Sequence, residues 1–246
     1  MTIDTQMINT DCVEWMGQQP DQSQDIILTS PPYNLDMDYG HYRDLIPDYR
    51  HWMAQWIDQG CRLLRDTGRF IINIQPKYSD RAPYHHWIHH IMEKNRMIWY
   101  GERIWQKNNI TGYRGAAGSM GRSSKPYLWY STEYVQVFCK EHLYRPCSAE
   151  QSLLTMPEQT AWAKDHIWNI APVRQQRHPA QMPEQLVERC LKLFARRGDR
   201  VLDPFAGVGT TMRVCERLGL DSTGCEIDPD YVKSWQEDRD DTRTED

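Results

Sequence analysis

Short apolar runs alternate with longer amphipathic stretches along this chain of 246 residues. The apolar runs predict strands at 25–28, 69–74, 97–105, 133–139, 200–203 and 222–225. Stretches in which apolar residues recur every three or four positions predict helices at 47–64, 84–94, from Pro183 onward and at 210–218. Strands that alternate with helices, without an internal repeat, are typical of an α/β protein with a doubly wound, mostly parallel sheet.

Three stretches lack this periodicity. Residues 107–125 are rich in Gly, Ser, Asn and Arg, which indicates a polar loop with a functional role. Residues 144–178 are irregular and contain several prolines. The last eleven residues carry six acids and two arginines, so we expect a disordered acidic tail at 236–246. The rest of the chain, 1–235, is expected to be one domain with an insertion.

For a possible nucleic-acid partner, the distribution of charge along the chain is more informative than the net charge of -5. The acidic tail alone accounts for -4 of that total. Residues 103–125 contain five basic side chains and no acidic one. A local basic surface of this kind can neutralise phosphates, so a nucleic-acid partner fits the chain despite its negative total.

Composition also indicates the class of protein and its compartment. No apolar run approaches the length of a membrane span, and the N-terminus lacks the basic and then apolar layout of a signal peptide. The seven cysteines form no CxxC pair, which favours reduced thiols over disulfides or a zinc site. We therefore expect a cytoplasmic protein without a metal.

The most informative stretch is Val201–Thr211, an apolar strand followed by a glycine turn and the start of a helix. Glycines allow backbone N–H groups and a helix N-terminus to approach a ligand closely, as in nucleotide-binding α/β folds. Glu226 follows Gly209 by 17 residues, after the next predicted strand, where an acid suits ribose hydroxyls. No stretch matches the phosphate-binding P-loop pattern.

A second motif is Thr29–Tyr33, with the sequence Thr-Ser-Pro-Pro-Tyr, directly after the first predicted strand. Two prolines make this loop rigid. The Ser30 hydroxyl and the Pro31 carbonyl are hydrogen-bond acceptors, and Tyr33 offers a ring for stacking. This set suits a planar group with an exocyclic NH2, whereas the plainer interpretation is a proline-rich strand exit with a packing tyrosine.

Together the two motifs resemble those of the S-adenosylmethionine-dependent DNA amino-methyltransferases, the N4-cytosine/N6-adenine type. Thr29–Tyr33 is similar to that family's catalytic (D/N/S)-P-P-(Y/F/W) motif, and Asp203–Thr211 is similar to its cofactor motif. His178–Pro183 resembles the segment that lines the methionine end of the cofactor site. Catalytic motif first and cofactor motif second is the circularly permuted order of the β class. The resemblance fades in 107–168, where such enzymes place their target-recognition region.

The resemblance implies a Rossmann-like methyltransferase fold, S-adenosyl-L-methionine as cofactor, and DNA as substrate with the target base flipped out. It implies a homodimer as the common assembly of the class and leaves a restriction partner open. The implied catalytic residues are Ser30, Pro31, Pro32 and Tyr33. The implied cofactor-binding residues are Thr29, His178, Pro179, Asp203, Phe205, Ala206, Gly207, Gly209, Thr210 and Glu226. The expected DNA-binding residues are Lys107, Arg114, Arg122 and Lys125.

Individual roles follow from the same resemblance. Ser30 Oγ and the Pro31 carbonyl would accept hydrogen bonds from the target amine, and Tyr33 would stack on the base. Asp203 would contact the methionine amine of the cofactor, directly or through water, and Glu226 would hold the ribose. Thr210 is a candidate cap of the following helix.

The choice between target bases depends on the first position of the catalytic motif. Ser30 favours cytosine N4, whereas the following Asn34 is more frequent in the adenine N6 type. Methylation of cytosine carbon needs a cysteine nucleophile, and Pro146–Cys147 lies in an irregular segment instead of after a strand. An RNA base, a protein glutamine, or a silent DNA-binding subunit are the remaining alternatives.

Two other clusters have structural interpretations. The histidines of 85–90 form two i, i+4 pairs on a predicted helix, without the carboxylate of a zincin motif, and are expected on a solvated face. Trp52 and Trp56 share a helical stripe and are expected in the core.

Overall fold

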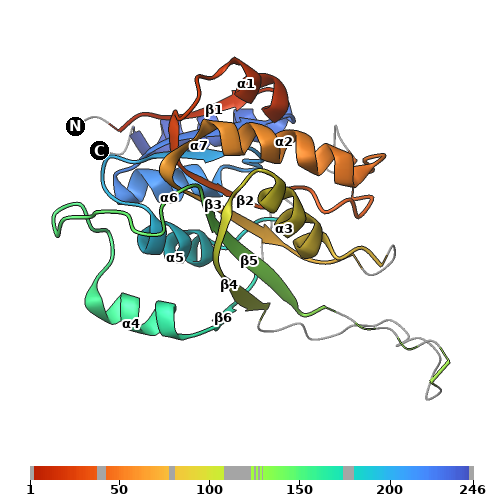
Figure 1. Ribbon diagram of the computed structural model, residues 1–246. Coiled ribbons are helices and arrows are strands. Elements are labelled where there is room, and N and C mark those ends of the chain that lie inside the picture. Colours follow the sequence, from red (N-terminus) through yellow and green to blue (C-terminus); the bar gives the residue numbers. More distant parts are fainter. Residues whose placement is uncertain are drawn as a thin grey trace.

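The computed structural model describes residues 3–37, 43–77, 81–107, 123–124, 126, 128, 130–173 and 180–243, without the side chains of 240–243. One eight-stranded sheet organises the protein (Figure 1), in the order β1-β8-β7-β2-β3-β5-β4-β6. Its strands are β1 (Thr5–Asn9), β2 (Gln24–Thr29), β3 (Leu64–Ile74), β4 (Ile98–Lys107), β5 (Thr132–Cys139), β6 (Ile167–Ile170), β7 (Arg200–Asp203) and β8 (Asp221–Glu226).

The sheet is mostly parallel, as the sequence predicts. The pairs β1/β8, β8/β7, β7/β2, β2/β3 and β4/β6 are parallel. Only β5 runs antiparallel to its two neighbours, β3 and β4. Each parallel connection between neighbouring strands needs a crossover, and helices supply most of these crossovers.

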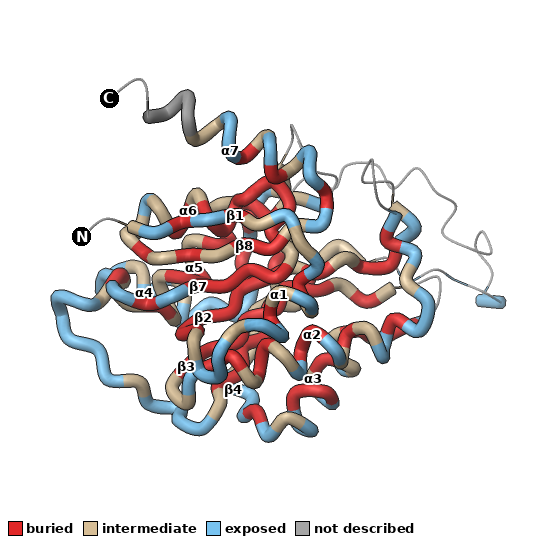
Figure 2. The backbone as a smooth tube through the Cα atoms, turned by 90° about the horizontal axis from the view of Figure 1, so that it is seen from above, coloured by how far each residue is buried: buried red, intermediate tan, exposed pale blue. Residues whose placement is uncertain are grey.

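Helices cover both faces of the sheet (Figures 1 and 2). They are α1 (Cys12–Gln18), α2 (Tyr49–Leu63), α3 (Tyr84–Lys94), α4 (Met156–Lys164), α5 (Glu184–Phe194), α6 (Thr210–Leu218) and α7 (Pro229–Arg243). The buried side chains of α1, α2 and α3 form one core cluster with the sheet, and those of α5 and α6 form the other. The period of two along each strand assigns the faces: Ile27 belongs to the first cluster, while its neighbours Ile26 and Leu28 belong to the second.

The pattern of apolar residues located the central strands and the helices α2, α3, α5 and α6 but missed five elements. These are β1, α1, α4, β6 and α7. No residue of α4 is buried, and an exposed helix has no apolar stripe from which the sequence could predict it. The one feature of the sequence that indicates a helix here is a capping box, in which the side chains of Thr155 and Glu158 each accept a hydrogen bond from the backbone N–H of the other.

The prediction of a disordered tail from position 236 was wrong for residues 236–243. They continue helix α7, which begins at Pro229. Trp235 is buried against Met212, and Arg239 donates to the carbonyl of Thr5 and pairs with Glu216 across 2.8 Å. These contacts anchor the acidic segment to β1 and α6.

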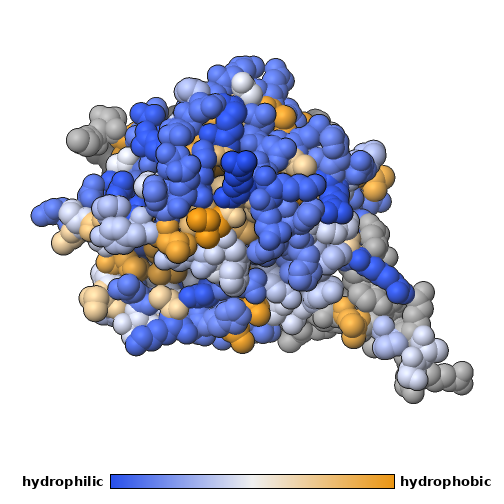
Figure 3. Space-filling model, in the orientation of Figure 1, coloured by the Kyte–Doolittle hydropathy of each residue, from blue (hydrophilic) through white to orange (hydrophobic). Residues whose placement is uncertain are grey.

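The face of the molecule seen in Figure 3 is mainly polar. Figure 3 shows hydrophilic side chains over most of one face, with apolar ones gathered over the part where Figure 1 shows α5. Within the described ranges, no helix combines the length and apolar character needed to cross a bilayer. The same ranges hold no group of three or more His, Cys, Asp or Glu side chains in a metal-binding arrangement.

The expected solvated face of α3 holds for His86 and His90, which are exposed, whereas His85 and His89 are half-buried. His85 stacks on Tyr134 of β5, with ring centroids 4.2 Å apart and planes 2° from parallel. Its Nδ1 is buried without a hydrogen-bond partner among the described residues. Burial, and then the neighbouring His86, lower the pKa of His85 to about 4.

This histidine should make the fold acid-sensitive. Below the ordinary histidine pKa of about 6.5, the unfolded chain binds a proton that the folded chain excludes until about pH 4. The free energy of unfolding should therefore fall as pH falls through that window. His85→Phe keeps a ring on Tyr134 and should remove roughly 1 kcal/mol of the decline between pH 7 and pH 5, allowing for partial solvent access. Urea titrations at both pH values measure it, and parallel declines in both proteins would contradict it.

Candidate active site

The two sequence motifs lie side by side at the centre of the sheet. Strands β2 and β7 are neighbours, with Ile26 opposite Val201 and Ile27 opposite Leu202. Beyond β2 the chain turns toward α2 on one face, and beyond β7 it turns into α6 on the other. The point where successive connections diverge to opposite faces leaves a crevice at the carboxyl ends of the strands, the usual ligand site of such sheets.

A buried carboxylate holds the two strand exits together. Asp203, at the end of β7, is 1% exposed and accepts hydrogen bonds from Thr29 Oγ1 at 2.7 Å and Thr211 Oγ1 at 2.6 Å. It also accepts from the backbone N–H of Phe205 at 3.1 Å. Burial raises the pKa of Asp203, and these three bonds oppose that rise. Asp203 and Thr29 thus support the crevice from behind instead of lining it.

The turn after β7 depends on two glycines with left-handed backbone. Gly207 has φ 54° and Gly209 has φ 78°. A Cβ on Gly209 would lie 2.2 Å from Cδ1 of Trp235, so helix α7 packs directly on this turn. Gly209 is the N-cap residue of α6, without a side-chain cap. The expectation that Thr210 caps this helix was therefore wrong; its Oγ1 instead lies 3.3 Å from Arg213 Nη2 and 3.4 Å from Gln181 Nε2.

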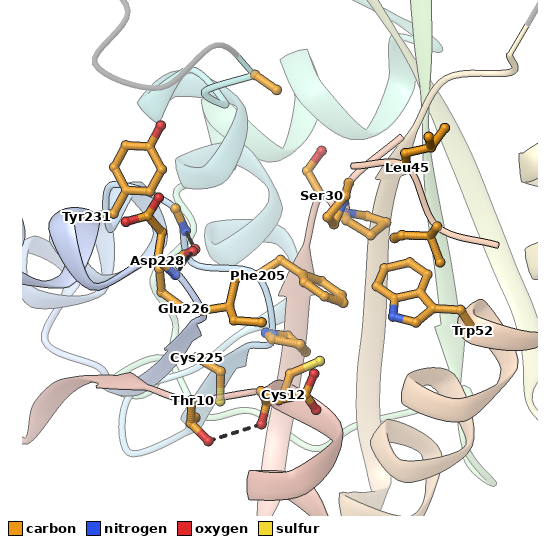
Figure 4. A pocket seen from close by; sticks show the side chains of 18 of the residues that line it. Thr10, Cys12, Ser30, Leu45, Trp52, Phe205, Cys225, Glu226, Asp228 and Tyr231 are labelled. Atoms are coloured by element: carbon orange, nitrogen blue, oxygen red, sulfur yellow. Dashed lines mark hydrogen bonds between the residues drawn. The ribbon is translucent and has the colours of Figure 1, made fainter. Parts of the chain in front are cut away.

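A cavity of about 270 Å³ opens at this edge of the sheet. It is close to the lower end of the range of small-molecule sites, about 300–1,000 Å³. Figure 4 shows Phe205 between two groups of lining side chains. One group is Ser30, Leu45 and Trp52, and the other is Glu226, Asp228 and Tyr231.

Glu226 lies at the polar end of the cavity. Its Oε2 accepts from the backbone N–H of Gly207 at 2.8 Å, and its Oε1 accepts from the backbone N–H of Asp228 at 2.9 Å. Burial raises the pKa of Glu226, and these two bonds counter it. Each carboxylate oxygen keeps a second lone pair, so Glu226 can still accept hydrogen bonds from ligand hydroxyls.

The described lining residues include three acids, Asp11, Glu226 and Asp228, and no lysine, arginine or histidine. Such a cavity favours a cation that also carries hydroxyl groups. S-adenosylmethionine has both features, because its sulfonium and amine are positively charged and its ribose carries two hydroxyls. The residues present therefore fit the cofactor that the sequence implies.

The Ser-Pro-Pro-Tyr motif divides between the cavity and the interior. Ser30, Pro31 and Pro32 line the cavity. The carbonyl of Pro32 accepts a hydrogen bond from the Tyr49 hydroxyl, which leaves the Pro31 carbonyl as the candidate acceptor for a substrate. Tyr33 is 9% exposed and does not line the cavity. This placement gives no support to the expectation that Tyr33 stacks on a base, since its ring belongs to the core cluster.

The hydroxyl of Tyr33 enters a buried polar network. It lies 2.9 Å from Ser30 Oγ and 2.8 Å from Glu133 Oε2. Asn73 Nδ2 donates to Tyr33 Oη at 3.0 Å and to Glu133 Oε2. The ammonium of Lys107 forms an ion pair with Glu133 Oε1 and lies over the Trp105 ring.

Sequence reasoning did not find Asn73 or Glu133, although both stand in predicted strands. A buried polar residue inside an apolar strand was the available signal. Lys107, expected at DNA, is already paired with Glu133, so its geometry gives no support to a phosphate contact.

The loop after the catalytic motif is folded by side-chain carboxylate and amide oxygens. Asp44 is fully buried and accepts from the backbone N–H groups of Leu35 and Met37 at 3.0 and 2.6 Å. Asn34, with φ 55°, accepts from the N–H of Ile46 at 2.7 Å. These bonds bring Leu45 and Ile46 to the cavity. Asn34 therefore has a structural role in folding its own loop.

The predicted site residues thus fall into three groups. Those that line the cavity are Ser30, Pro31, Pro32, Phe205, Gly207 and Glu226. Those that do not line it are Thr29, Tyr33, Lys107, Asp203, Ala206, Gly209 and Thr210. Those outside the described residues are His178, Pro179, Arg114, Arg122 and Lys125.

The sequence missed several lining residues because they come from segments far from both motifs, on helices α1, α2 and α7 and on the loops before them. These are Asp11, Cys12, Leu45, Trp52, Asp228 and Tyr231. Trp52 was expected in the core; it packs against Phe205, with ring centroids 5.4 Å apart, and also lines the cavity. Trp56 is fully buried, as expected.

Replacing Asp203 should loosen the site from behind. Asp203→Ala leaves three buried donors without their acceptor and should lower the free energy of unfolding by about 3 kcal/mol. Thr211→Val removes only one of the three bonds and should cost about 1 kcal/mol. Urea denaturation at neutral pH measures both. If the Asp203→Ala protein has the same free energy of unfolding as the wild type, the hydrogen bonds of this carboxylate do not stabilise the site.

Comparison with known proteins assigns the family. The N6/N4 DNA methylase family model matches residues 24–237. Type II methyltransferase M.HpaI of Haemophilus parainfluenzae is 26% identical over 96% of this chain and 74% of its own length. Type II methyltransferase M.BamHI of Bacillus amyloliquefaciens is also 26% identical, and this chain spans 58% of its length.

Solved structures agree on the fold. TTHA0409 of Thermus thermophilus, in its complex with S-adenosyl-L-methionine, is 26% identical and superposes with a TM-score of 0.73, covering 95% of this chain and 92% of its own. The PvuII DNA methyltransferase, described as cytosine-N4-specific, is 17% identical with a TM-score of 0.74, covering 96% and 86%, a likeness of fold alone. The family model, the relatives and the acid-lined cavity agree, and the chain belongs to the N6/N4 DNA methylase family, the DNA amino-methyltransferases that use S-adenosyl-L-methionine.

Proposed function

We propose that this protein transfers a methyl group from S-adenosyl-L-methionine to the N4 amine of cytosine in DNA. The observation that carries the proposal is the position of Ser30, whose side chain lines the acid-lined cavity beside Phe205 and Trp52 (Figure 4). A neutral hydroxyl at the first position of the motif favours the cytosine type, and Asn34, the one residue that pointed to adenine, is used in folding its own loop.

The reaction needs an aromatic amine whose lone pair points at the methyl group. In cytosine that lone pair is delocalised into the ring, so a geometry that favours a tetrahedral nitrogen lowers the barrier. Ser30 Oγ and the Pro31 carbonyl would accept hydrogen bonds from the two N–H groups and hold the nitrogen in that geometry. The cofactor supplies an electrophilic methyl on its sulfonium, so neither a cysteine nucleophile nor a metal is needed. The new C–N bond would form as the S–CH3 bond breaks, S-adenosylhomocysteine would be the leaving group, and the amine would give up one proton to solvent.

The acidic end of the cavity would bind the cofactor. Glu226 is fixed by two backbone N–H groups and would accept hydrogen bonds from ribose hydroxyls. Asp11 and Asp228 add negative charge around it. Phe205, between this end and Ser30, would place the methyl-bearing part of the cofactor beside the catalytic loop.

DNA would approach along the same edge of the sheet. A second cavity, of about 450 Å³, lies beyond the carboxyl end of β3 and is lined by Lys77, Arg81, Ser124 and Tyr130, among others, with no acid among the described residues. Its charge suits a phosphate backbone. The target cytosine would leave the duplex to reach Ser30, because stacking and pairing hide its amine. Arg114, Arg122 and Lys125 remain predicted DNA contacts.

The product identifies the target directly. Purified protein with unmethylated genomic DNA and methyl-labelled S-adenosylmethionine should yield N4-methylcytosine after digestion and mass spectrometry of the nucleosides. Ser30→Ala should lower turnover by about 100-fold, within the range found for loss of one group that stabilises a transition state, and should leave cofactor affinity within about twofold. Label on adenine N6 would overturn the choice of base. Undiminished turnover by Ser30→Ala would overturn the role of Ser30, and bound cofactor without labelled DNA would favour a silent subunit.

A further inference from the structure

We propose that Glu133 is a positioning residue that acts through the Tyr33 hydroxyl to keep Ser30 Oγ a hydrogen-bond acceptor toward the target amine. The proposal rests on the function proposed above for Ser30. It gives Tyr33 a role different from the one the motif suggested, since its hydroxyl links the cavity to a charged pair in the interior.

Glu133 is placed to control this link. It is the second residue of β5 and is 4% exposed. Its Oε1 is paired with the ammonium of Lys107, at the end of β4. Its Oε2 faces two donors, the Tyr33 hydroxyl at 2.8 Å and the Asn73 amide. A carboxylate with a cationic partner accepts hydrogen bonds and donates none.

The count of protons then decides which way each hydroxyl points. Tyr33 has one hydroxyl proton, and its shortest contact is to Glu133 Oε2, a charge-assisted acceptor. The backbone carbonyl of Asn73 lies farther from Tyr33 Oη, at 3.3 Å. Burial first, and the charge of Glu133 second, raise the pKa of Tyr33, so the hydroxyl keeps its proton at neutral pH.

Ser30 must therefore donate to Tyr33. The two oxygens are 2.9 Å apart, and the Tyr33 proton is already directed at Glu133. Asn73 cannot reverse this direction, because the amide nitrogen that faces Tyr33 and Glu133 is itself a donor. Asn73 Nδ2 also approaches Ser30 Oγ, at 3.4 Å, and takes up one of its two lone pairs. With its proton directed inward, Ser30 Oγ keeps the other lone pair for the cavity, as an incoming N–H group requires.

Without the charge, the opposite arrangement becomes available. A neutral amide at position 133 can turn its NH2 toward Tyr33, whose proton can then be directed at Ser30 Oγ. The Ser30 proton would in that case be directed into the cavity, against the N–H groups of the amine. Two donors facing one another lose the hydrogen bond on which the geometry of the nitrogen depends.

The test is a double-mutant cycle between Glu133 and Tyr33. In the full chain with methyl-labelled cofactor and DNA, Glu133→Gln should lower kcat by roughly 10- to 100-fold, the rate equivalent of one charge-assisted hydrogen bond. The KM for S-adenosylmethionine should change less than about twofold, since Glu133 does not line the cavity. In a Tyr33→Phe background the same change should cost less than about threefold, because the linking hydroxyl is absent.

Controls separate this role from simple stability. Glu216→Gln breaks another glutamate ion pair, with Arg239 on α7, and should leave kcat unchanged. Each variant is checked for folding by thermal melting. If Glu133→Gln alone does not fold because the half-buried Lys107 loses its partner, Lys107→Met with Glu133→Gln removes both charges and is used in the same cycle.

A wild-type kcat in the Glu133 variant would overturn the proposal, as would an equal loss in the wild-type and Tyr33→Phe backgrounds. The nucleoside product distinguishes this failure from failure of the function proposed above. Label on adenine N6 with the coupled loss intact would refute the choice of cytosine and support the positioning role. N4-methylcytosine made at an undiminished rate by Glu133→Gln would support the choice of cytosine and refute the positioning role of Glu133.

Discussion

The hydrogen bonds of the Asp203 carboxylate hold together the two halves of the site. This buried side chain accepts from the end of β2, from the turn that follows β7 and from the first turn of α6. A carboxylate in an apolar core is costly unless its oxygens are satisfied, so the three donors stay in place around it. The Ser-Pro-Pro-Tyr loop and the glycine turn are separated by about 170 residues along the chain, and they meet where this one group joins them.

Around that point the residues divide into those that face the cavity and those that support them. Ser30, Phe205 and Glu226 face the cavity, and each is held by groups behind it. Two backbone N–H groups hold Glu226, while Ser30 is held by the network that runs to Glu133. Pre-organisation of this kind matters because a reacting group that is fixed before the substrate arrives need not be ordered during the reaction.

The sequence predicted the architecture and the two motifs well because both depend on local pattern. The apolar runs of β2, β3 and β7 and the glycine turn at Gly207 and Gly209 can be recognised from residues that are neighbours in the sequence. The direction in which a side chain points cannot be recognised from its sequence neighbours. Tyr33 points into the core, Trp52 lines the cavity, and Asp228 joins it from the turn after β8, because packing between distant segments decides each orientation. Helix α4 was not predicted because none of its residues is fully buried, and Trp162 alone packs partly against the core.

We infer that the two motifs form one site, with the cofactor between them. A crystal structure of the protein with S-adenosyl-L-methionine would reveal whether they do. We expect density for the ribose at Glu226 and for the sulfonium end beside Ser30 and Pro31, with Asp203 still bonded to Thr29 and Thr211. Cofactor bound elsewhere, or with its sulfonium end turned away from Ser30, would show that the two motifs do not share one site.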